Sequence, residues 1–184
     1  MQRSVAGLVL GYHGCSREVA DRLIGGEAFR QSQNPYDWLG DGVYFWESDP
    51  VRALQWANDA VARKSYEEAA VIGAILDLEL CLDLTTQSSL DVIRTAYEDL
   101  QAVVNSLGET LVENKSDLLR QRDNAVLNYL YESMPDPKFQ TVRGVFTEGD
   151  WLYPGARIHS QTHVQIAVRD LSCIKGVFRP AMPA

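Results

Sequence analysis

The stretch Leu39-Gly40-Asp41-Gly42-Val43-Tyr44-Phe45-Trp46-Glu47 organises the chain. Its two glycines free the backbone for a turn or for the close approach of a ligand, and three aromatic residues then follow in a row. Because successive strand residues point to opposite faces, Tyr44 and Trp46 share one face and Phe45 takes the other. One ring can therefore line a cleft while its neighbour packs into a core.

A second unusual patch, Gly11-Tyr12-His13-Gly14-Cys15-Ser16, lies upstream at the end of an apolar stretch that predicts a buried strand over 6–13. Ser16 is a good N-cap for a short helix, and Gly25-Gly26 would end it. The polar segment 27–39 that follows predicts a long loop. The two patches are therefore separated by a strand end, a helix and a loop.

The rest of the chain alternates between helical and strand periods. A helix is expected at 50–63, since proline at its first position loses no needed hydrogen bond, and the apolar run 70–78 predicts a central strand. The further expectations are a strand at 82–85, a helix at 88–108 capped by Ser88, a helix from 116 to before Pro135, and strands at 141–147, 162–168 and 174–178. This order predicts an α+β fold, with one domain over 1–184 and an all-helical insertion at about 88–134.

Composition limits the class of protein. The chain is 46% hydrophobic and 23% charged, with a formal net charge of −8, which argues against attachment to anionic membranes or to phosphate backbones in general. Three widely spaced cysteines match no disulfide or metal pattern and favour a reducing, cytoplasmic location. The apolar run at the N-terminus is too short for a signal peptide or a membrane span.

The two patches together resemble the ADP-ribosyltransferase family of the diphtheria-toxin and poly(ADP-ribose) polymerase type. In that family one strand ends in His-Gly, as at His13-Gly14, and a second carries Gly-x-Gly-[Ile/Val]-Tyr-Phe, as at 40–45. The match covers roughly the first 60 residues and a weaker C-terminal portion. It implies an ADP-ribosyltransferase-like split β-sheet that binds NAD+ as substrate in a cleft between its two halves.

The resemblance also implies roles for individual residues. His13 would hydrogen-bond the adenosine ribose, Gly14 would offer backbone groups to the nicotinamide carboxamide, and Tyr44 would stack on the nicotinamide ring. Trp56 would form the second wall, where the family more often has tyrosine. The other residues expected around the nucleotide are Cys15, Gly42, Phe45 and Ala53. This interpretation depends on the rings of His13 and Tyr44 converging on one slot.

The third motif of the family departs from its pattern here. Cleavage of the nicotinamide–ribose bond develops positive charge on the ribose, and a fixed carboxylate stabilises that charge best. Alignment of Val168-Arg169-Asp170 places Gln165 where the family has glutamate. Glu148 is the nearest replacement, so we expect Glu148 as the catalytic carboxylate and Gln165 as a group that orients the substrate. The missing glutamate argues against polymer synthesis and favours mono-ADP-ribosyl transfer.

Each of these residues also has an ordinary structural explanation. His13 alone could be a satisfied histidine at a strand end, and Tyr44 and Trp56 alone could be core aromatics. Glu148 beside Gly149 could be a solvated carboxylate in a turn. No metal is expected, because His159 and His163 have no further ligand near them in the sequence.

The sequence thus predicts a mono-ADP-ribosyltransferase that moves ADP-ribose from NAD+ to a macromolecular acceptor, protein or nucleic acid. A small domain of this kind would suit a bacterial toxin or phage-defence effector, with an antitoxin or immunity protein as its partner and no membrane involvement. Two alternatives stay open. Gln165 favours a non-catalytic module that binds NAD+ or ADP-ribose, and an NAD+ glycohydrolase would need no acceptor at all.

Overall fold

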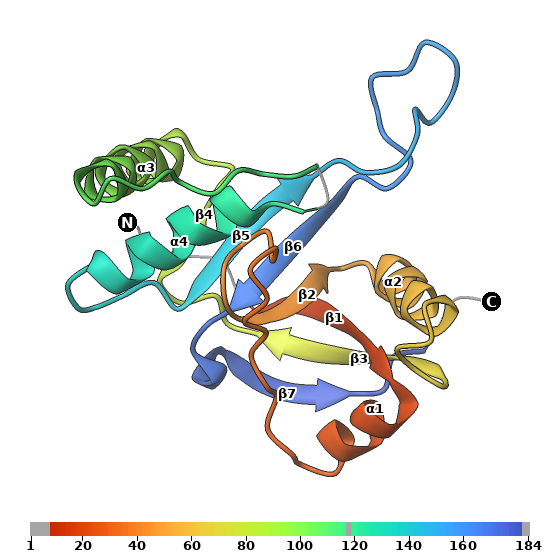
Figure 1. Cartoon of the computed structure of the whole chain (residues 1–184). Helices are drawn as coiled ribbons and strands as arrows, with labels where there is room; N and C mark the ends of the chain where they lie inside the picture. The colour runs from red at the N-terminus through yellow and green to blue at the C-terminus, as the bar shows by residue number, and fades with distance from the viewer. Residues whose placement is uncertain (1–7, 117–118, 182–184) are drawn as a thin grey trace.

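A computed structural model describes residues 8–116 and 119–181 (Figure 1). Within these residues the chain forms an α+β fold with one mixed seven-stranded sheet and four α-helices, which confirms the predicted class. The elements in chain order are β1 (Val9–Ser16), α1 (Arg17–Ile24), β2 (Val43–Glu47), α2 (Pro50–Ala62), β3 (Ala69–Leu76), β4 (Cys81–Asp83), α3 (Gln87–Ser106), α4 (Gln121–Ser133), β5 (Thr141–Phe146), β6 (His163–Val168), a 3-10 turn (Leu171–Cys173) and β7 (Ile174–Phe178).

The strands lie in the order β4-β5-β6-β2-β1-β3-β7. The short strand β4 runs parallel to β5, and every other neighbouring pair is antiparallel. The two strands that carry the sequence motifs, β1 and β2, are therefore direct neighbours near the middle of the sheet. The third motif lies on β6, which pairs with the other edge of β2.

Capping residues explain where the first helices begin. The Ser16 hydroxyl accepts a hydrogen bond from the Val19 amide at 3.2 Å and starts α1, as predicted. Asp49 caps α2 in the same way, with Pro50 in the first turn. The predicted cap of the third helix is wrong, because Thr86 rather than Ser88 accepts the capping bond, and α3 begins one residue earlier.

The two faces of the sheet carry different motif residues. Gly14 lies against the Ala53 backbone of α2, whereas its neighbour Cys15 packs under α1. We call these the Tyr44 face and the His13 face. The Tyr44 face carries Gly14, Tyr44, Trp46, His163, Gln165 and Ala167, and the His13 face carries His13, Cys15, Val43, Phe45, Ile166 and Val168.

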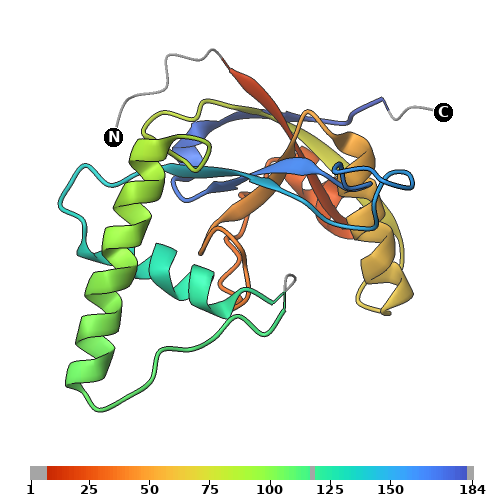
Figure 2. The ribbon, with the colours of Figure 1, turned by 90° about the horizontal axis from the view of Figure 1, so that it is seen from above.

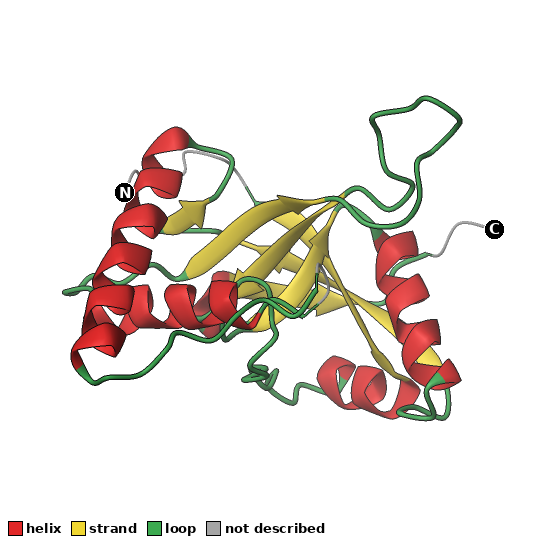
Figure 3. Cartoon of the chain, turned by 45° about the horizontal axis from the view of Figure 1, so that its top comes forward, coloured by secondary structure: helices red, strands yellow, loops and turns green. Residues whose placement is uncertain are grey.

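Helices cover the two ends of the Tyr44 face. Figure 2 shows α2 at one end and the α3–α4 pair at the other, with the loop between α1 and β2 lying between them. Figure 3 shows the same arrangement from another side, with the strands between the helical groups. A buried cluster that includes Leu39, Leu127, Val142 and Phe146 joins α4 to β5.

The middle of the chain differs from the prediction of an all-helical insertion at about 88–134. Helices α3 and α4 are separated by residues 107–120, of which the described ones are not helical.

Within the described ranges, we find no helix that has both the length and the apolar character needed to cross a membrane.

Candidate functional site

Strands β1 and β2 separate just where the two motifs meet. Their pairing covers Gly11 with Glu47 and Tyr12 with Trp46, and then stops. The next residues in register would be His13 with Phe45 and Gly14 with Tyr44, but these pairs do not form part of the ladder. We call this opening between the end of β1 and the start of β2 the split.

Gly14 presents its backbone to the split. The Ser48 amide donates to the Leu10 carbonyl at 2.8 Å, so the backbone groups of Leu10 point toward β2. Because these directions alternate along an antiparallel strand, the N–H and C=O of Gly14 also point toward β2. They face the region from which β2 has moved away. This is the arrangement that the expected carboxamide contact of Gly14 requires.

The His13 side chain spans the split. Its Nδ1 lies 2.8 Å from the carbonyl oxygen of Tyr44. A carbonyl only accepts hydrogen bonds, so Nδ1 carries the proton and donates. Burial lowers the pKa of His13 below its ordinary value of 6.5, and the bond to the Tyr44 carbonyl only partly offsets that effect. The ring is therefore neutral at pH 7, with Nε2 as a hydrogen-bond acceptor.

The expectation that the rings of His13 and Tyr44 face one slot is wrong. The imidazole lies on the His13 face, 5.6 Å from the ring of Phe29 and 5.7 Å from that of Phe45. The Tyr44 ring lies on the other face and packs against the cluster below α4. Alternation along β2 is the reason, since Phe45 and Tyr44 cannot share a face. The shared slot on which the interpretation of the sequence depends is therefore not formed by the two rings. The two residues meet through the His13 side chain and the Tyr44 backbone carbonyl instead.

The hydroxyl of Tyr44 is held by the loop that precedes β2. It donates to the Gly40 carbonyl at 2.7 Å and accepts from the Leu39 amide at 2.8 Å. Burial, the largest effect, raises the pKa of Tyr44 well above 10. Tyr44 thus connects the loop to the sheet, and its phenol carries no charge at any ordinary pH.

Glu148 lies at the Tyr44 face and forms a nearly buried ion pair. Its Oε2 is 2.5 Å from Nη2 of Arg52 on α2, and the side chains of Arg52 and Glu148 are only 10% and 12% exposed. The same carboxylate oxygen is 3.8 Å from Nδ1 of His163. Glu148 is therefore a positioned carboxylate rather than a solvated one, but a guanidinium already compensates its charge.

His163 connects Glu148 to Gln165. Its Nδ1 lies 2.7 Å from the Gln161 carbonyl, so Nδ1 donates. Burial lowers the pKa of His163 below 6.5, and the neutral ring has its lone pair on Nε2. That atom lies 3.1 Å from Nε2 of Gln165, so it accepts from the amide. The Gln165 amide oxygen is thereby turned away from His163, as an acceptor for another group.

The remaining predicted residues are placed as follows. The side chains of Cys15 and Phe45 are in the core, 2% and 0% exposed, and burial raises the pKa of Cys15 to about 11. Gly42 exchanges two backbone hydrogen bonds with Ser32, and a methyl group there would contact the Val168 carbonyl at 3.0 Å. Cys15 and Phe45 could thus meet a ligand only through their backbones.

Ala53 and Trp56 lie on α2. Ala53 is fully buried, and its carbonyl oxygen lies against Gly14, so that no side chain fits at position 14. The ring of Trp56 packs on Trp46, with 5.8 Å between centroids. The structure thus places Trp56 on the Tyr44 face, as a partner of Trp46.

Sequence reasoning missed Arg52 and the linking role of His163. Arg52 occupies the buried side of α2 together with three alanines, and an arginine flanked by apolar residues is the signal that could have identified it. Three buried donors in this region have no hydrogen-bond partner in the described part of the chain: Trp46 Nε1, Arg52 Nε and Arg52 Nη1. The arginine therefore keeps hydrogen-bonding capacity beyond its pair with Glu148.

Metal ligation has no support in the described residues. Across 8–116 and 119–181, His, Cys, Asp and Glu side chains form no group of three or more that could hold an ion. The site offers a carboxylate, an amide oxygen, an imidazole acceptor and backbone groups, which suit hydrogen bonding to a polar organic ligand.

Comparison with known proteins gives one similar sequence. The chain is 24% identical over 142 residues to the uncharacterized protein MJ0359 of Methanocaldococcus jannaschii, a match that covers 73% of this chain and 63% of that protein. The chain thus spans less than two thirds of the length of the relative it matches. No protein-family model and no solved structure matches the chain.

Proposed function

We propose that this protein is an NAD+-dependent mono-ADP-ribosyltransferase with an ADP-ribosyltransferase-like split sheet. The observation that carries the proposal is the split itself. The pairing of β1 and β2 stops at Tyr12 and Trp46, His13 donates to the Tyr44 carbonyl across the gap, and the backbone N–H and C=O of Gly14 point toward it. These are the positions at which the motifs resemble the family.

The nucleotide would cross the split from one face of the sheet to the other. Adenosine would lie on the His13 face, where Nε2 of His13 accepts a hydrogen bond from the ribose. The nicotinamide carboxamide would meet the backbone of Gly14, and the nicotinamide riboside would reach the Tyr44 face near Gln165. In this binding mode the nucleotide is not held between the rings of His13 and Tyr44, because these two rings lie on opposite faces of the sheet.

The reaction breaks the bond between C1′ of the ribose and the nicotinamide nitrogen. The bonding electrons leave with nicotinamide, which becomes neutral, and positive charge develops on the ribose. The Gln165 amide oxygen would accept from a ribose hydroxyl, and Glu148 would supply negative charge nearby. The acceptor nucleophile then attacks C1′ and gives up a proton, for which Glu148 is the base that the site offers.

A second candidate is a non-catalytic module that binds NAD+ or ADP-ribose. The ion pair of Glu148 with Arg52 favours it, because a compensated carboxylate stabilises a developing cation less well. Gln165 favours it too, since an amide carries no charge. Both candidates use the same split and differ in turnover.

Incubation with NAD+ labelled in its adenylate half, with cell lysate as the source of acceptors, tests the proposal. We expect label on protein or nucleic acid, at a rate that Glu148→Gln lowers by about 100-fold. Glu98→Gln, an exposed change on α3, is the matched control and leaves the rate intact. An intact rate in Glu148→Gln would show that Glu148 is not the catalytic carboxylate.

The other outcomes separate the alternatives. Release of nicotinamide without transferred label would indicate a glycohydrolase. A higher melting temperature with NAD+, without either product, would indicate the binding module.

Induced expression in a bacterial host tests the toxin and defence roles. Growth arrest by the wild type but not by Glu148→Gln would support these roles, and a co-expressed antitoxin would relieve the growth arrest.

A further inference from the structure

The orientation of the Gln165 amide depends on His163. The Nε2 atoms of the two side chains lie 3.1 Å apart, and in the described part of the chain the Gln165 side chain has no other hydrogen-bond partner. An amide has a donor at one end and an acceptor at the other, so the proton on the imidazole decides which end turns toward it. While Nε2 of His163 is unprotonated, the amide NH2 faces the imidazole and the amide oxygen faces away.

The imidazole of His163 is held in place by its surroundings. Its side chain is fully buried, and its Nδ1 donates to the Gln161 carbonyl at 2.7 Å. Three aromatic rings lie around it, with centroid distances of 6.0 to 6.4 Å: those of Phe146, Trp38 and Trp46. This packing opposes rotation of the imidazole, so a change of protonation is what can alter its bond to Gln165.

The charged groups near His163 come from several elements. They are Glu148 after β5, Arg52 of α2, Asp49 at the start of α2 and, packed on the Trp38 and Phe146 rings, Arg120 at the start of α4. The Glu148 carboxylate lies 3.8 Å from Nδ1 and is compensated by Arg52. Burial has the largest effect and lowers the pKa of His163 below 6.5. The ring is therefore neutral at pH 7 and gains a proton in acid.

A proton on Nε2 of His163 would reverse the Gln165 amide. Nε2 would then donate, and only the amide oxygen can accept from it. The NH2 group would take the place of the oxygen on the far side. A ribose hydroxyl both donates and accepts, so it can hydrogen-bond the amide in either orientation. The transition state cannot, because the NH2 group would face the positive charge that develops on the ribose.

We propose that His163 positions Gln165 for catalysis only while its ring is neutral, and that protonation of the ring turns the amide over and lowers kcat without releasing NAD+. The inference rests on the proposed function, in which the Gln165 oxygen accepts from the ribose. Gln165 contacts the substrate in this scheme, whereas His163 acts through Gln165 as a positioning residue.

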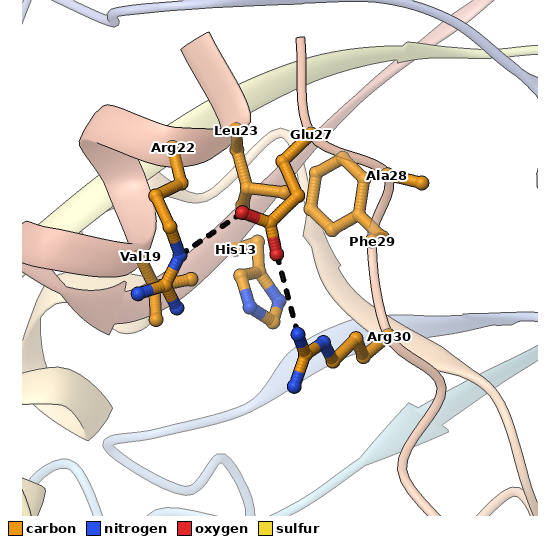
Figure 4. Close-up of a pocket in the computed structure, with 8 residues that line it drawn as sticks. All are labelled: His13, Val19, Arg22, Leu23, Glu27, Ala28, Phe29 and Arg30. Atoms are coloured by element: carbon orange, nitrogen blue, oxygen red, sulfur yellow. Dashed lines mark ion pairs between the residues drawn. The ribbon is translucent and has the colours of Figure 1, made fainter. Parts of the chain in front are cut away.

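His13 is the other buried histidine, and its protonation should have a different effect. It lines a cavity of about 140 Å³ on the opposite face of the sheet, between α1 and the loop that follows it (Figure 4). Figure 4 shows the Glu27 carboxylate in front of this imidazole, paired with Arg22 and Arg30. In the proposed binding mode His13 contacts the adenosine, so its charge would change KM. A change in kcat therefore distinguishes His163 from His13.

Nicotinamide release from NAD+, with lysate as the source of acceptors, tests the inference between about pH 8 and pH 5. We expect the wild-type kcat to be constant at the alkaline end and to fall about tenfold per pH unit below the pKa of His163. His163→Gln has no ring to protonate, so it should lose this fall and keep the wild-type dependence of KM on pH. His163→Asn is a second variant with the same expectation.

His159→Gln is the matched control. His159 is the third histidine of the chain, and it hydrogen-bonds the Gly149 carbonyl and packs on Trp151. This variant should keep the fall in kcat, and circular dichroism at each pH establishes that every protein is folded. A fall that His163→Gln retains, or a wild-type kcat that stays constant over the whole range, would overturn the inference. In both cases the turnover of NAD+, and with it the proposed function, would stand. No nicotinamide release by the folded wild type at any pH would overturn both proposals.

Nitrogen NMR of the labelled histidine rings gives a readout that does not depend on activity. We expect His163 to carry its proton on Nδ1 at neutral pH, and the pH at which Nε2 gains a proton should match the midpoint of the fall in kcat. A proton on Nε2 at neutral pH would overturn the inference, because Nε2 would then hold the amide oxygen of Gln165 in the active protein.

Discussion

The two faces of the sheet each carry a glutamate paired with arginine, but in opposite surroundings. On the His13 face, Glu27 is 39% exposed and shares Arg22 with Glu18. On the Tyr44 face, Glu148 and Arg52 are 12% and 10% exposed and lie 2.5 Å apart. Water screens the ion pairs of Glu27, so a ligand can replace its arginine partners at little cost in free energy. The Glu148–Arg52 pair is desolvated, so removal of either side chain leaves the other as an uncompensated buried charge.

The difference predicts different mechanical behaviour for the two groups. The exposed carboxylate of Glu27 can exchange its arginine partners readily, because water screens these ion pairs. A buried pair that also contacts His163 suits a fixed geometry, in which Gln165 keeps one orientation. Measurements of stability can test this contrast directly, because the two groups should respond very differently to the loss of one member.

The largest effect should come from breaking the buried pair. Arg52→Leu leaves the Glu148 carboxylate without its cation and should lower the free energy of unfolding by about 3–5 kcal/mol, measured by chemical denaturation. The double variant Arg52→Leu/Glu148→Leu should recover part of this loss, because no uncompensated charge remains. The exposed pair Arg94–Asp91, 64% and 54% exposed, is the control: Arg94→Leu should cost less than about 1 kcal/mol. Equal losses at both pairs would contradict the contrast.

A smaller loss is expected at Gly14, where the two faces meet. A methyl group there would overlap the carbonyl oxygen of Ala53, so Gly14→Ala should cost about 1–3 kcal/mol by forcing α2 from the sheet. Gly176→Ala on β7 is the control, since it meets nothing within 4 Å. A Gly14→Ala protein as stable as Gly176→Ala would show that α2 packs less closely than described.

Lowering the pH should reduce the free energy of unfolding, because one histidine on each face, His13 and His163, is buried in its neutral form. Burial lowers the pKa of both His13 and His163 below 6.5 in the folded state. As pH falls through 6.5, the unfolded chain binds protons that the folded chain does not. The free energy of unfolding therefore falls as pH falls over this range, and the contribution of these two histidines does not change above it. The fall should be smaller in His13→Gln and in His163→Gln than in the wild type, and equal falls in all three would contradict this.

The smallest effect should come from Glu27 on the exposed side. Glu27→Gln breaks only screened ion pairs and should change the free energy of unfolding by less than about 1 kcal/mol. A loss as large as that in Arg52→Leu would show that Glu27 holds the fold together.

Local patterns in the sequence predicted most of the elements. Ser16 and Pro50 mark the starts of α1 and α2, and the alternation at 163–168 predicts a strand that the structure contains. Each of these signals depends on residues within one or two turns of each other. Residue type alone is a poorer guide within α2, where the apolar Val51 is 44% exposed and the charged Arg52 is buried.

The candidate site was harder to predict, because it depends on pairings between distant segments. Arg52 and Glu148 are 96 positions apart, and nothing near either residue identifies its partner. The register of β1 on β2 decides that His13 meets the carbonyl rather than the ring of Tyr44. Glu148, Gln165 and His163 were all noted in the sequence, but only the sheet brings them together.

A crystal structure with a non-hydrolysable NAD+ analogue would show whether the split is the nucleotide site. We expect the nucleotide to lie across the split between β1 and β2, with the adenosine ribose hydrogen-bonded to Nε2 of His13 and the carboxamide to the backbone of Gly14. An analogue bound elsewhere, or a split closed by continued pairing of Gly14 with Tyr44, would contradict it.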